Sequence, residues 1–108
     1  MSHEKYQTVI KTLHECMEAC NHCYDACLQE EDVNAMAECI RLDRECADMC
    51  AYLEQALVRG TPFAKELADV CAKICEACGN YCKQHNHDHC QACADACFKC
   101  ADACRNIA

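Results

Sequence analysis

The feature that most constrains the fold is a cysteine repeat with helical spacing. The pattern C-x3-C-x2-C-x3-C occurs at residues 16–27, 71–82 and 93–104, and a fourth copy at residues 39–50 has Asp43 in place of one cysteine. Steps of four and three residues are the a and d steps of a heptad, so each copy places its cysteines along one face of a helix. The repeat therefore predicts four helices, each with a stripe of thiols.

Breaks between the copies indicate how these helices are connected. Acidic residues at 30–32, the sequence RGTP at 59–62 and the sequence KQHNHD at 83–88 interrupt the helical pattern. Thr61 and Pro62 are expected at the N-cap and the first position of the third helix. Such short connections favour an all-α fold, an antiparallel up-down-up-down four-helix bundle with a cysteine-lined core. Residues 1–108 are expected to form this single domain, with helices at about residues 4–29, 33–58, 62–83 and 88–106.

Because the repeat is palindromic, an antiparallel bundle stacks its cysteines in layers. The expected layers are Cys16, Cys50, Cys71 and Cys104; then Cys20, Cys46, Cys75 and Cys100; then Cys23, Asp43, Cys78 and Cys97; and finally Cys27, Cys39, Cys82 and Cys93. Apolar residues before the first layer predict a hydrophobic plug made of Val9, Leu13, Leu53, Leu57, Phe63, Leu67 and Ile107. Beyond the last layer lie metal-ligating residue types, namely Met36, His85, His87, His89 and Cys90. The sequence thus predicts one closed apolar end and one open, ligand-rich end.

The composition narrows the classes of function. Sixteen cysteines in 108 residues would suggest a disulfide scaffold in a secreted chain, but the N-terminal residues do not resemble an export signal. We therefore expect a cytoplasmic protein whose thiols are reduced. A net charge of −8 and the absence of long apolar runs argue against nucleic acid and membrane as partners.

Explanations other than metal binding account for the repeat less well. Neutral packing would leave a core of small cysteines underfilled. Disulfides between cysteines four residues apart on one helix have unsuitable geometry, although pairs across helices remain open. A thioredoxin-like motif needs a strand before it and a helix N-terminus, whereas these C-x2-C pairs lie in mid-helix. No isolated nucleophile–base pair indicates an enzyme, so no catalytic residue is assigned.

Charge favours Cu(I) among the thiophilic metals. Thiolates select Cu(I), zinc or iron–sulfur clusters. A tetrathiolate zinc site is dianionic, and four of them in one core would bury about eight uncompensated charges. About one Cu(I) per bridging thiolate leaves the core near neutral. The sequence therefore predicts a store of multiple Cu(I) ions, with a zinc or mixed-metal thiolate buffer and a thiol/disulfide redox protein as alternatives.

The repeats, together with CIRLDRECAD at 39–48 and HDHCQAC at 87–93, resemble the cytosolic branch of the bacterial cysteine-rich copper storage proteins. The resemblance covers essentially the whole chain. It implies a four-helix bundle that assembles as a homotetramer and binds many Cu(I) ions for storage or sequestration. It does not identify a copper donor or acceptor protein.

Carried over by position, the resemblance makes every cysteine a thiolate ligand, that is Cys16, Cys20, Cys23, Cys27, Cys39, Cys46, Cys50, Cys71, Cys75, Cys78, Cys82, Cys90, Cys93, Cys97, Cys100 and Cys104. His87 is expected as a ligand at the open end. Asp43 is expected as a ligand or as a hydrogen-bond partner of a thiol, with a solvated carboxylate as the alternative. Further candidate ligands at the open end are His85, His89 and Met36, for which surface or packing roles are also open. His14 and His22 fall off the stripes, and Gly79 predicts a close approach of another backbone.

Overall fold

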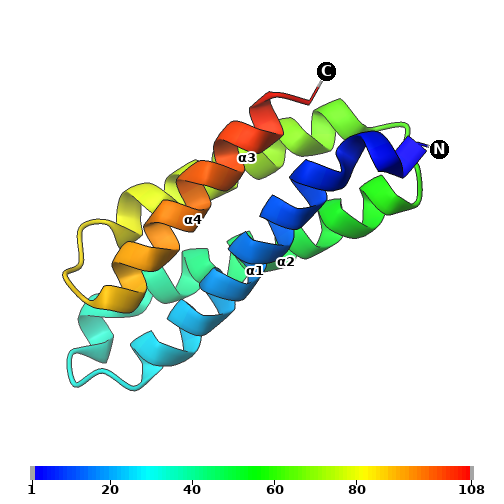
Figure 1. The fold of residues 1–108 in the computed structure, drawn as a ribbon. Helices are drawn as coiled ribbons and strands as arrows, with labels where there is room; N and C mark the ends of the chain where they lie inside the picture. Colours follow the sequence, from blue (N-terminus) through cyan, green and yellow to red (C-terminus); the bar gives the residue numbers. More distant parts are fainter. Residues whose placement is uncertain (1, 108) are drawn as a thin grey trace.

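The computed structural model of the protein describes residues 2–107 and shows an all-helical bundle (Figure 1). Its α-helices are α1 (Gln7–Leu28), α2 (Ala37–Val58), α3 (Ala64–Cys82) and α4 (Asp88–Arg105). Short 3-10 helices, η1 (Ser2–Tyr6) and η2 (Val33–Met36), precede α1 and α2. Each α-helix packs on its neighbours in chain order, and α4 also packs on α1. The predicted fold class, an antiparallel four-helix bundle, is confirmed, and the described residues contain no strand.

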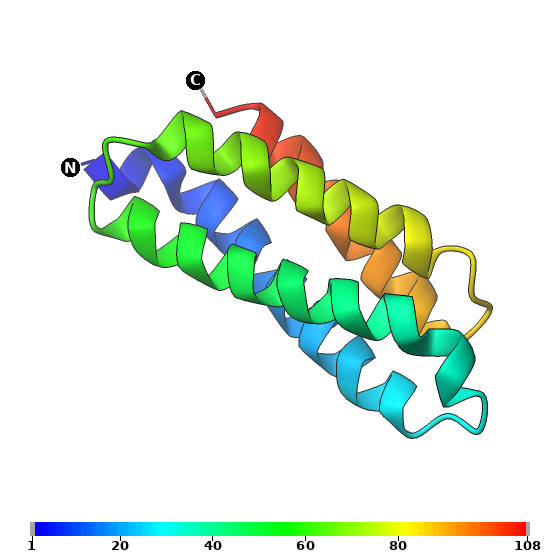
Figure 2. The same cartoon turned by 180° about the vertical axis from the view of Figure 1, so that it is seen from behind.

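The connections create two different ends on a molecule that measures 48 × 18 × 18 Å. We call one end the apolar end; it carries η1, the α2–α3 connection and the end of α4, and it is closed by Leu13, Leu53, Leu57 and Ile107 (Figures 1 and 2). We call the opposite end the mouth; it carries the α1–α2 and α3–α4 connections (Figures 1 and 2). Glu30, Met36 and His87 lie in these connections, and His89 lies in the first turn of α4. None of the helices in the described part of the chain combines the length and the apolarity needed to cross a membrane.

Large aliphatic side chains fill the apolar end. Leu13, Leu53 and Leu57 have no exposed surface, and Ile107 is 7% exposed. Partly buried side chains that pack on this core include Val9 and Leu67. Phe63 was expected in this plug, but it is 58% exposed, because it lies in the turn that precedes α3. Its predicted place in the core is therefore wrong.

Helix α3 begins two residues later than expected. Its N-cap is Phe63, and the first intrahelical bond runs from the N–H of Leu67 to the carbonyl of Phe63 over 2.9 Å. The side chain of Thr61 accepts a hydrogen bond from the N–H of Phe63 at 3.1 Å. Thr61 therefore caps the turn before the helix, with Pro62 inside that turn, rather than the helix itself.

The glycine within α3 makes room for an aromatic ring of α4. A Cβ atom added at Gly79 would lie 2.8 Å from the ring of Phe98. The close neighbour is thus a side chain of the same subunit, whereas the sequence had indicated another backbone. This contact holds α3 and α4 together in the half of the bundle near the mouth.

Candidate metal centre

All sixteen cysteines are free thiols buried in the core of the bundle. Fifteen of them have no exposed surface, and Cys104 is 1% exposed. Most neighbouring sulfurs on different helices are 3.6 to 4.0 Å apart, and the closest pair, Cys39 and Cys82, is 2.8 Å apart. A covalent S–S bond is about 2.05 Å long. The structure therefore shows a fully reduced core, without the cross-helix disulfides that the sequence left open.

The predicted pairing between α2 and α3 is confirmed in every layer. From the apolar end to the mouth, the pairs are Cys50 with Cys71 at 4.0 Å, Cys46 with Cys75 at 3.6 Å, Asp43 with Cys78 at 3.3 Å, and Cys39 with Cys82 at 2.8 Å. The short α2–α3 connection and the palindromic repeat bring these positions to equal heights, as predicted from the repeat.

Helix α4 is shifted along the bundle relative to the predicted layers. Cys97 was expected beside Cys23, but its sulfur lies 3.7 Å from that of Cys20. Cys90 was expected beyond the last layer, but its sulfur lies 3.9 Å from that of Cys23 and 3.8 Å from that of Cys27. The layers are consequently staggered, and Cys90 belongs to the thiol core.

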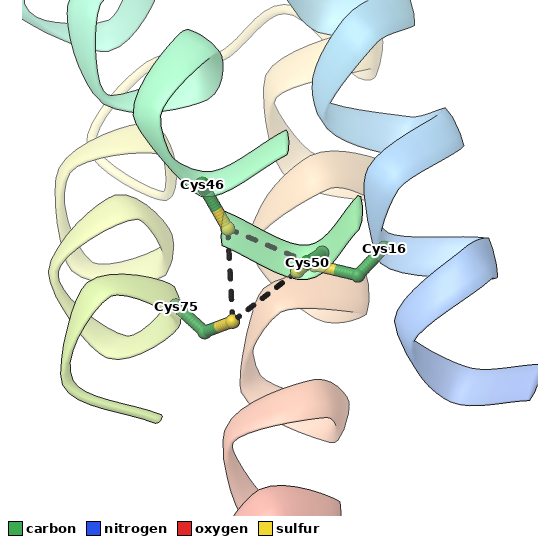
Figure 3. A group of neighbouring side chains, drawn as sticks. All are labelled: Cys16, Cys46, Cys50 and Cys75. Carbon is green, nitrogen blue, oxygen red and sulfur yellow. Dashed lines mark hydrogen bonds between the residues drawn. The ribbon is translucent and has the colours of Figure 1, made fainter. Parts of the chain in front are cut away.

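At several points, four sulfur atoms lie within 4.8 Å of one another. Such groups are Cys16, Cys46, Cys50 and Cys75; Cys16, Cys20, Cys46 and Cys97; Cys20, Cys78, Cys93 and Cys97; Cys23, Cys27, Cys39 and Cys90; and Cys50, Cys71, Cys75 and Cys100. Figure 3 shows the first group, in which side chains from α1, α2 and α3 point toward one another. Four of these five groups are linked through shared sulfurs, since Cys16, Cys20, Cys46, Cys50, Cys75 and Cys97 each belong to two of them.

The spacing of the sulfurs fits metal binding. A metal–sulfur bond of about 2.3 Å places the sulfurs of a tetrahedral site about 3.8 Å apart. The observed separations of 3.6 to 4.0 Å between neighbouring sulfurs bracket this value. A thiophilic ion can therefore be held by sulfurs that are already in place, and a shared sulfur can bridge two ions.

Asp43 is fully buried, which excludes the solvated carboxylate that the sequence left open. Its Oδ1 accepts hydrogen bonds from the thiols of Cys78, Cys82 and Cys93 at 3.3, 3.4 and 3.3 Å. The thiol of Cys39 donates to Oδ2 at 3.8 Å. Burial is the largest cause that raises the pKa of Asp43, to about 10. The carboxyl group is therefore neutral at pH 7.

Two thiols near the mouth, Cys27 and Cys90, are also held in their neutral form. Burial is the largest cause that raises the pKa of Cys90, to about 11, and it raises the pKa of Cys27 as well. A protonated thiol behaves as a small apolar group. At these two positions, the metal-free core thus resembles an ordinary hydrophobic core in charge.

At the mouth, His89 is the histidine that faces the thiols. Its Nδ1 lies 3.5, 3.6 and 3.8 Å from the sulfurs of Cys90, Cys23 and Cys27. These three sulfurs form a four-sulfur group with that of Cys39. The side chain of His89 is only 13% exposed. Of the histidines predicted as ligands, His89 is therefore the one that the structure brings together with a sulfur group.

His87, which the sequence favoured as the mouth ligand, lies one level further out. Its ring stacks on that of His89, with centroids 5.2 Å apart and planes 6° apart. Its Nδ1 is 3.4 Å from Glu30, and its Nε2 is 3.5 Å from Asp32. With 32% of its side chain exposed, His87 lies between the solvent and His89.

The other candidate ligands, His85 and Met36, lie in environments different from that of His89. The ring of His85 packs on Tyr81 with centroids 5.9 Å apart, and its Nε2 is buried without a hydrogen-bond partner. Met36 is fully buried in the hydrophobic core, as expected for a side chain that fills a gap. His14 and His22 are exposed, as their positions off the stripes predicted.

One mouth residue, Glu30, was not singled out by any pattern in the sequence, because it lies in a loop outside the repeats. Its Oε2 lies 2.8 Å from Nε2 of His89. The signal that could have indicated it is topological. In an antiparallel bundle, the α1–α2 and α3–α4 connections lie at the same end, so an acidic loop and a histidine-rich loop meet there.

Comparison with known proteins places the chain in a described group. A family model described as "Copper storage protein" matches residues 2–108. The uncharacterized cysteine-rich protein YhjQ of Bacillus subtilis (strain 168) is 53% identical over 106 residues, which cover 97% of this chain and 98% of that protein. The Cu(I)-bound structure of BsCsp3, from Bacillus subtilis, is 52% identical with a TM-score of 0.92, over 95% of this chain and 97% of that one. A cytosolic copper storage protein from Streptomyces lividans, solved with five coppers, is 37% identical with a TM-score of 0.91, over 96% and 92% of the two chains.

Proposed function

This chain belongs to the copper storage protein family, and we propose that it stores Cu(I) by binding many ions to the thiolates of its core. The observation that carries the proposal is the set of four-sulfur groups that share cysteines along the bundle. Shared sulfurs suit bridging thiolates, which hold adjacent metal ions in a continuous array. Isolated structural zinc sites, in contrast, are closed sets of four ligands.

Charge balance supports Cu(I) over a divalent ion. Each Cu(I) that binds a thiol displaces one proton, so a monovalent ion exchanges for a proton and leaves the core neutral. A divalent ion bound to four thiolates leaves two negative charges in a site where burial already favours uncharged groups. The buried core therefore accepts many monovalent ions at a lower electrostatic cost than the same number of tetrathiolate zinc sites.

We assign the ligand roles as follows. All sixteen cysteines act as thiolate ligands, and Asp43 hydrogen-bonds the neighbouring thiols and is available as an oxygen ligand. His89 supplies a nitrogen at the mouth, and His87 is the first histidine that incoming copper meets. His85 and Met36 are second candidates at the same end, because both lie in the connections that form the mouth.

The proposal also covers the cellular location and the oligomeric state of the protein. We propose a role in storage rather than catalysis, carried out in the cytoplasm, where thiols remain reduced. We also propose assembly as a homotetramer. Exposed apolar side chains suited to subunit contacts are Leu28, Tyr52, Val58, Phe63 and Val70. Light scattering of the purified protein coupled to size exclusion tests this, and a monomeric mass would contradict the proposal.

The test of storage is an anaerobic titration of the fully reduced protein with Cu(I) in competition with a chromophoric Cu(I) chelator. We expect tight uptake of about one ion per cysteine, because that ratio neutralises the thiolates. A parallel titration with Zn²⁺ is the comparison. Saturation with only a few Cu(I) ions, together with tighter binding of zinc, would favour the zinc or mixed-metal buffer. Loss of free thiols in air without tight metal binding would favour the redox protein.

A further inference from the structure

The carboxylate of Glu30 connects the α1–α2 loop to the histidine that faces the core. Its Oε2 lies 2.8 Å from Nε2 of His89, and the opposite ring nitrogen, Nδ1, is the one that lies 3.5 to 3.8 Å from three sulfurs. Glu30 is partly buried, with 29% of its side chain exposed. The imidazole is therefore held between a carboxylate on one side and a thiol group on the other.

This arrangement selects one form of the neutral imidazole. A carboxylate only accepts hydrogen bonds, so the nitrogen that contacts Glu30 must carry the proton. The other nitrogen, Nδ1, then has its lone pair directed at the sulfurs of Cys23, Cys27 and Cys90. A carboxylate behind a ligating histidine fixes the ring orientation and makes the free nitrogen more basic.

From this geometry we propose that Glu30 is a positioning residue for copper uptake, which holds His89 in the Nε2–H form so that Nδ1 presents its lone pair to metal at the mouth. The inference deepens the proposed function and rests on it for the metal. It gives a role in copper loading to a loop residue that lies outside the cysteine repeats.

The same carboxylate also organises His87. Nδ1 of His87 lies 3.4 Å from Oε2 of Glu30, and the His87 ring stacks on that of His89. Asp32 faces the other nitrogen of His87 at 3.5 Å. Asp32 contacts His87, whereas Glu30 contacts both rings, so Glu30 is the acidic residue that reaches His89.

The first experiment uses the metal-free protein, so its result does not depend on copper binding. Long-range proton–nitrogen NMR of histidine labelled with ¹⁵N, at about pH 8 where a histidine of ordinary pKa is neutral, reports which ring nitrogen carries the proton. We expect the Nε2–H form for His89 in the parent and in Glu30→Gln, whose amide oxygen still accepts a hydrogen bond. Glu30→Ala should give a mixture of both forms. A predominant Nδ1–H form in the parent, or no change in Glu30→Ala, overturns the proposal.

The second experiment follows the first Cu(I) ions by anaerobic stopped-flow absorbance. Glu30→Ala should slow their uptake about tenfold or more, the usual effect of losing the partner of a metal-ligating histidine. Glu30→Gln should restore most of the rate. Glu31→Gln, a neighbouring exposed residue, is the matched control for loss of one negative charge and should load like the parent.

A double-mutant comparison separates positioning from a general effect of charge. In a His89→Ala background, Glu30→Ala should cause much less slowing than in the parent, since the ring that it positions is gone and only its contact with His87 remains. Equal slowing in both backgrounds would overturn the proposal. The parent could also take up no Cu(I) while His89 keeps the Nε2–H form. In that case the proposed storage function is wrong, and so is the metal-binding part of this inference. The positioning of the ring by Glu30 would still hold.

Discussion

The two ends of the bundle are built from the same helices and the same heptad positions, yet they differ in what those positions hold. At the apolar end they carry Leu13, Leu53 and Leu57, all without exposed surface. At the mouth they end in Cys90 beside His89, whose side chain is 13% exposed. Water is therefore excluded at the apolar end, whereas the mouth presents the partly buried Nδ1 of His89 next to the sulfur of Cys90.

This difference separates folding from loading. Leucines at the apolar end contribute hydrophobic free energy whether or not metal is present. The mouth contributes less apolar burial and places its polar groups where an ion can arrive from solvent. We therefore expect copper to enter at the mouth and to change the stability of that end more than the other.

Copper removal should have the largest effect and should act mainly at the mouth. An ion present at about a thousandfold above its Kd stabilises the folded state by about 4 kcal/mol per site. The metal-free protein should remain helical, because its apolar end stays packed. Hydrogen exchange measured with and without Cu(I) should show a greater gain of protection near Cys27 and Cys90 than near Leu53. An equal gain at both ends would break the comparison.

The substitution Leu53→Ala tests the apolar end and should cost about 2 to 5 kcal/mol of unfolding free energy, since it removes a fully buried side chain and leaves a cavity. Urea unfolding of the metal-free protein measures this. The number of Cu(I) ions bound should be unchanged. Lys11→Ala, at an exposed position of α1, is the control and should cost about 0.5 kcal/mol or less. A loss of copper capacity in Leu53→Ala would show that the two ends are not independent.

Asp43→Asn should change how stability depends on pH. Burial holds the pKa of Asp43 at about 10 in the folded protein, far above the ordinary value of about 4 in the unfolded chain. Between these values the folded state binds a proton that the unfolded state lacks, so the parent loses stability as pH rises, by up to about 1.4 kcal/mol per unit. Urea unfolding of both metal-free proteins at about pH 5 and pH 7, below the ordinary thiol pKa of about 8.5, should show a shallower loss for the variant. Parallel losses would mean that Asp43 is ionised in the core.

The smallest effects should distinguish the two histidines of the mouth. His89→Ala should slow the first Cu(I) uptake about tenfold or more, at least as much as Glu30→Ala, since its Nδ1 faces three sulfurs. His87→Ala should slow loading less. In each variant, the number of Cu(I) ions bound at equilibrium should fall by no more than the loss of one ligand explains. Stopped-flow rates and equilibrium capacities give both quantities, with the exposed His22→Ala as the control. A larger effect for His87 would restore the order that the sequence alone suggested.

Much of the site could be predicted because it depends on distances within one helix. Steps of four and three residues put the cysteines on one face whatever the neighbours are, and the palindromic repeat with a short connection brought the α2–α3 pairs to equal heights. The burial of Asp43 was one of two open alternatives, since its place in the repeat matched a cysteine but its charge argued for solvent. The hydrogen bonds from its thiol neighbours favour the buried position of Asp43 over the solvated one.

The height of α4, the exposure of Phe63 and the choice between His87 and His89 could not be predicted. Each depends on the path of a loop, and loop geometry does not follow from hydrophobic period. The connection at residues 83–87 sets how far α4 slides along the bundle, and that offset brings Cys90 into the thiol core and turns Nδ1 of His89 toward it. Likewise, the turn before α3 places Phe63 outside the plug.

The sequence by itself therefore determined the helices, the thiol stripes and the separation into an apolar end and a ligand-rich end, because side-chain spacing along a helix is a local property. Only the tertiary structure decided which sulfurs share a group, which histidine faces them and that Glu30 lies behind it. These contacts join residues about 60 positions apart in the chain, and their distances are set by how helices and loops pack against one another rather than by any one segment.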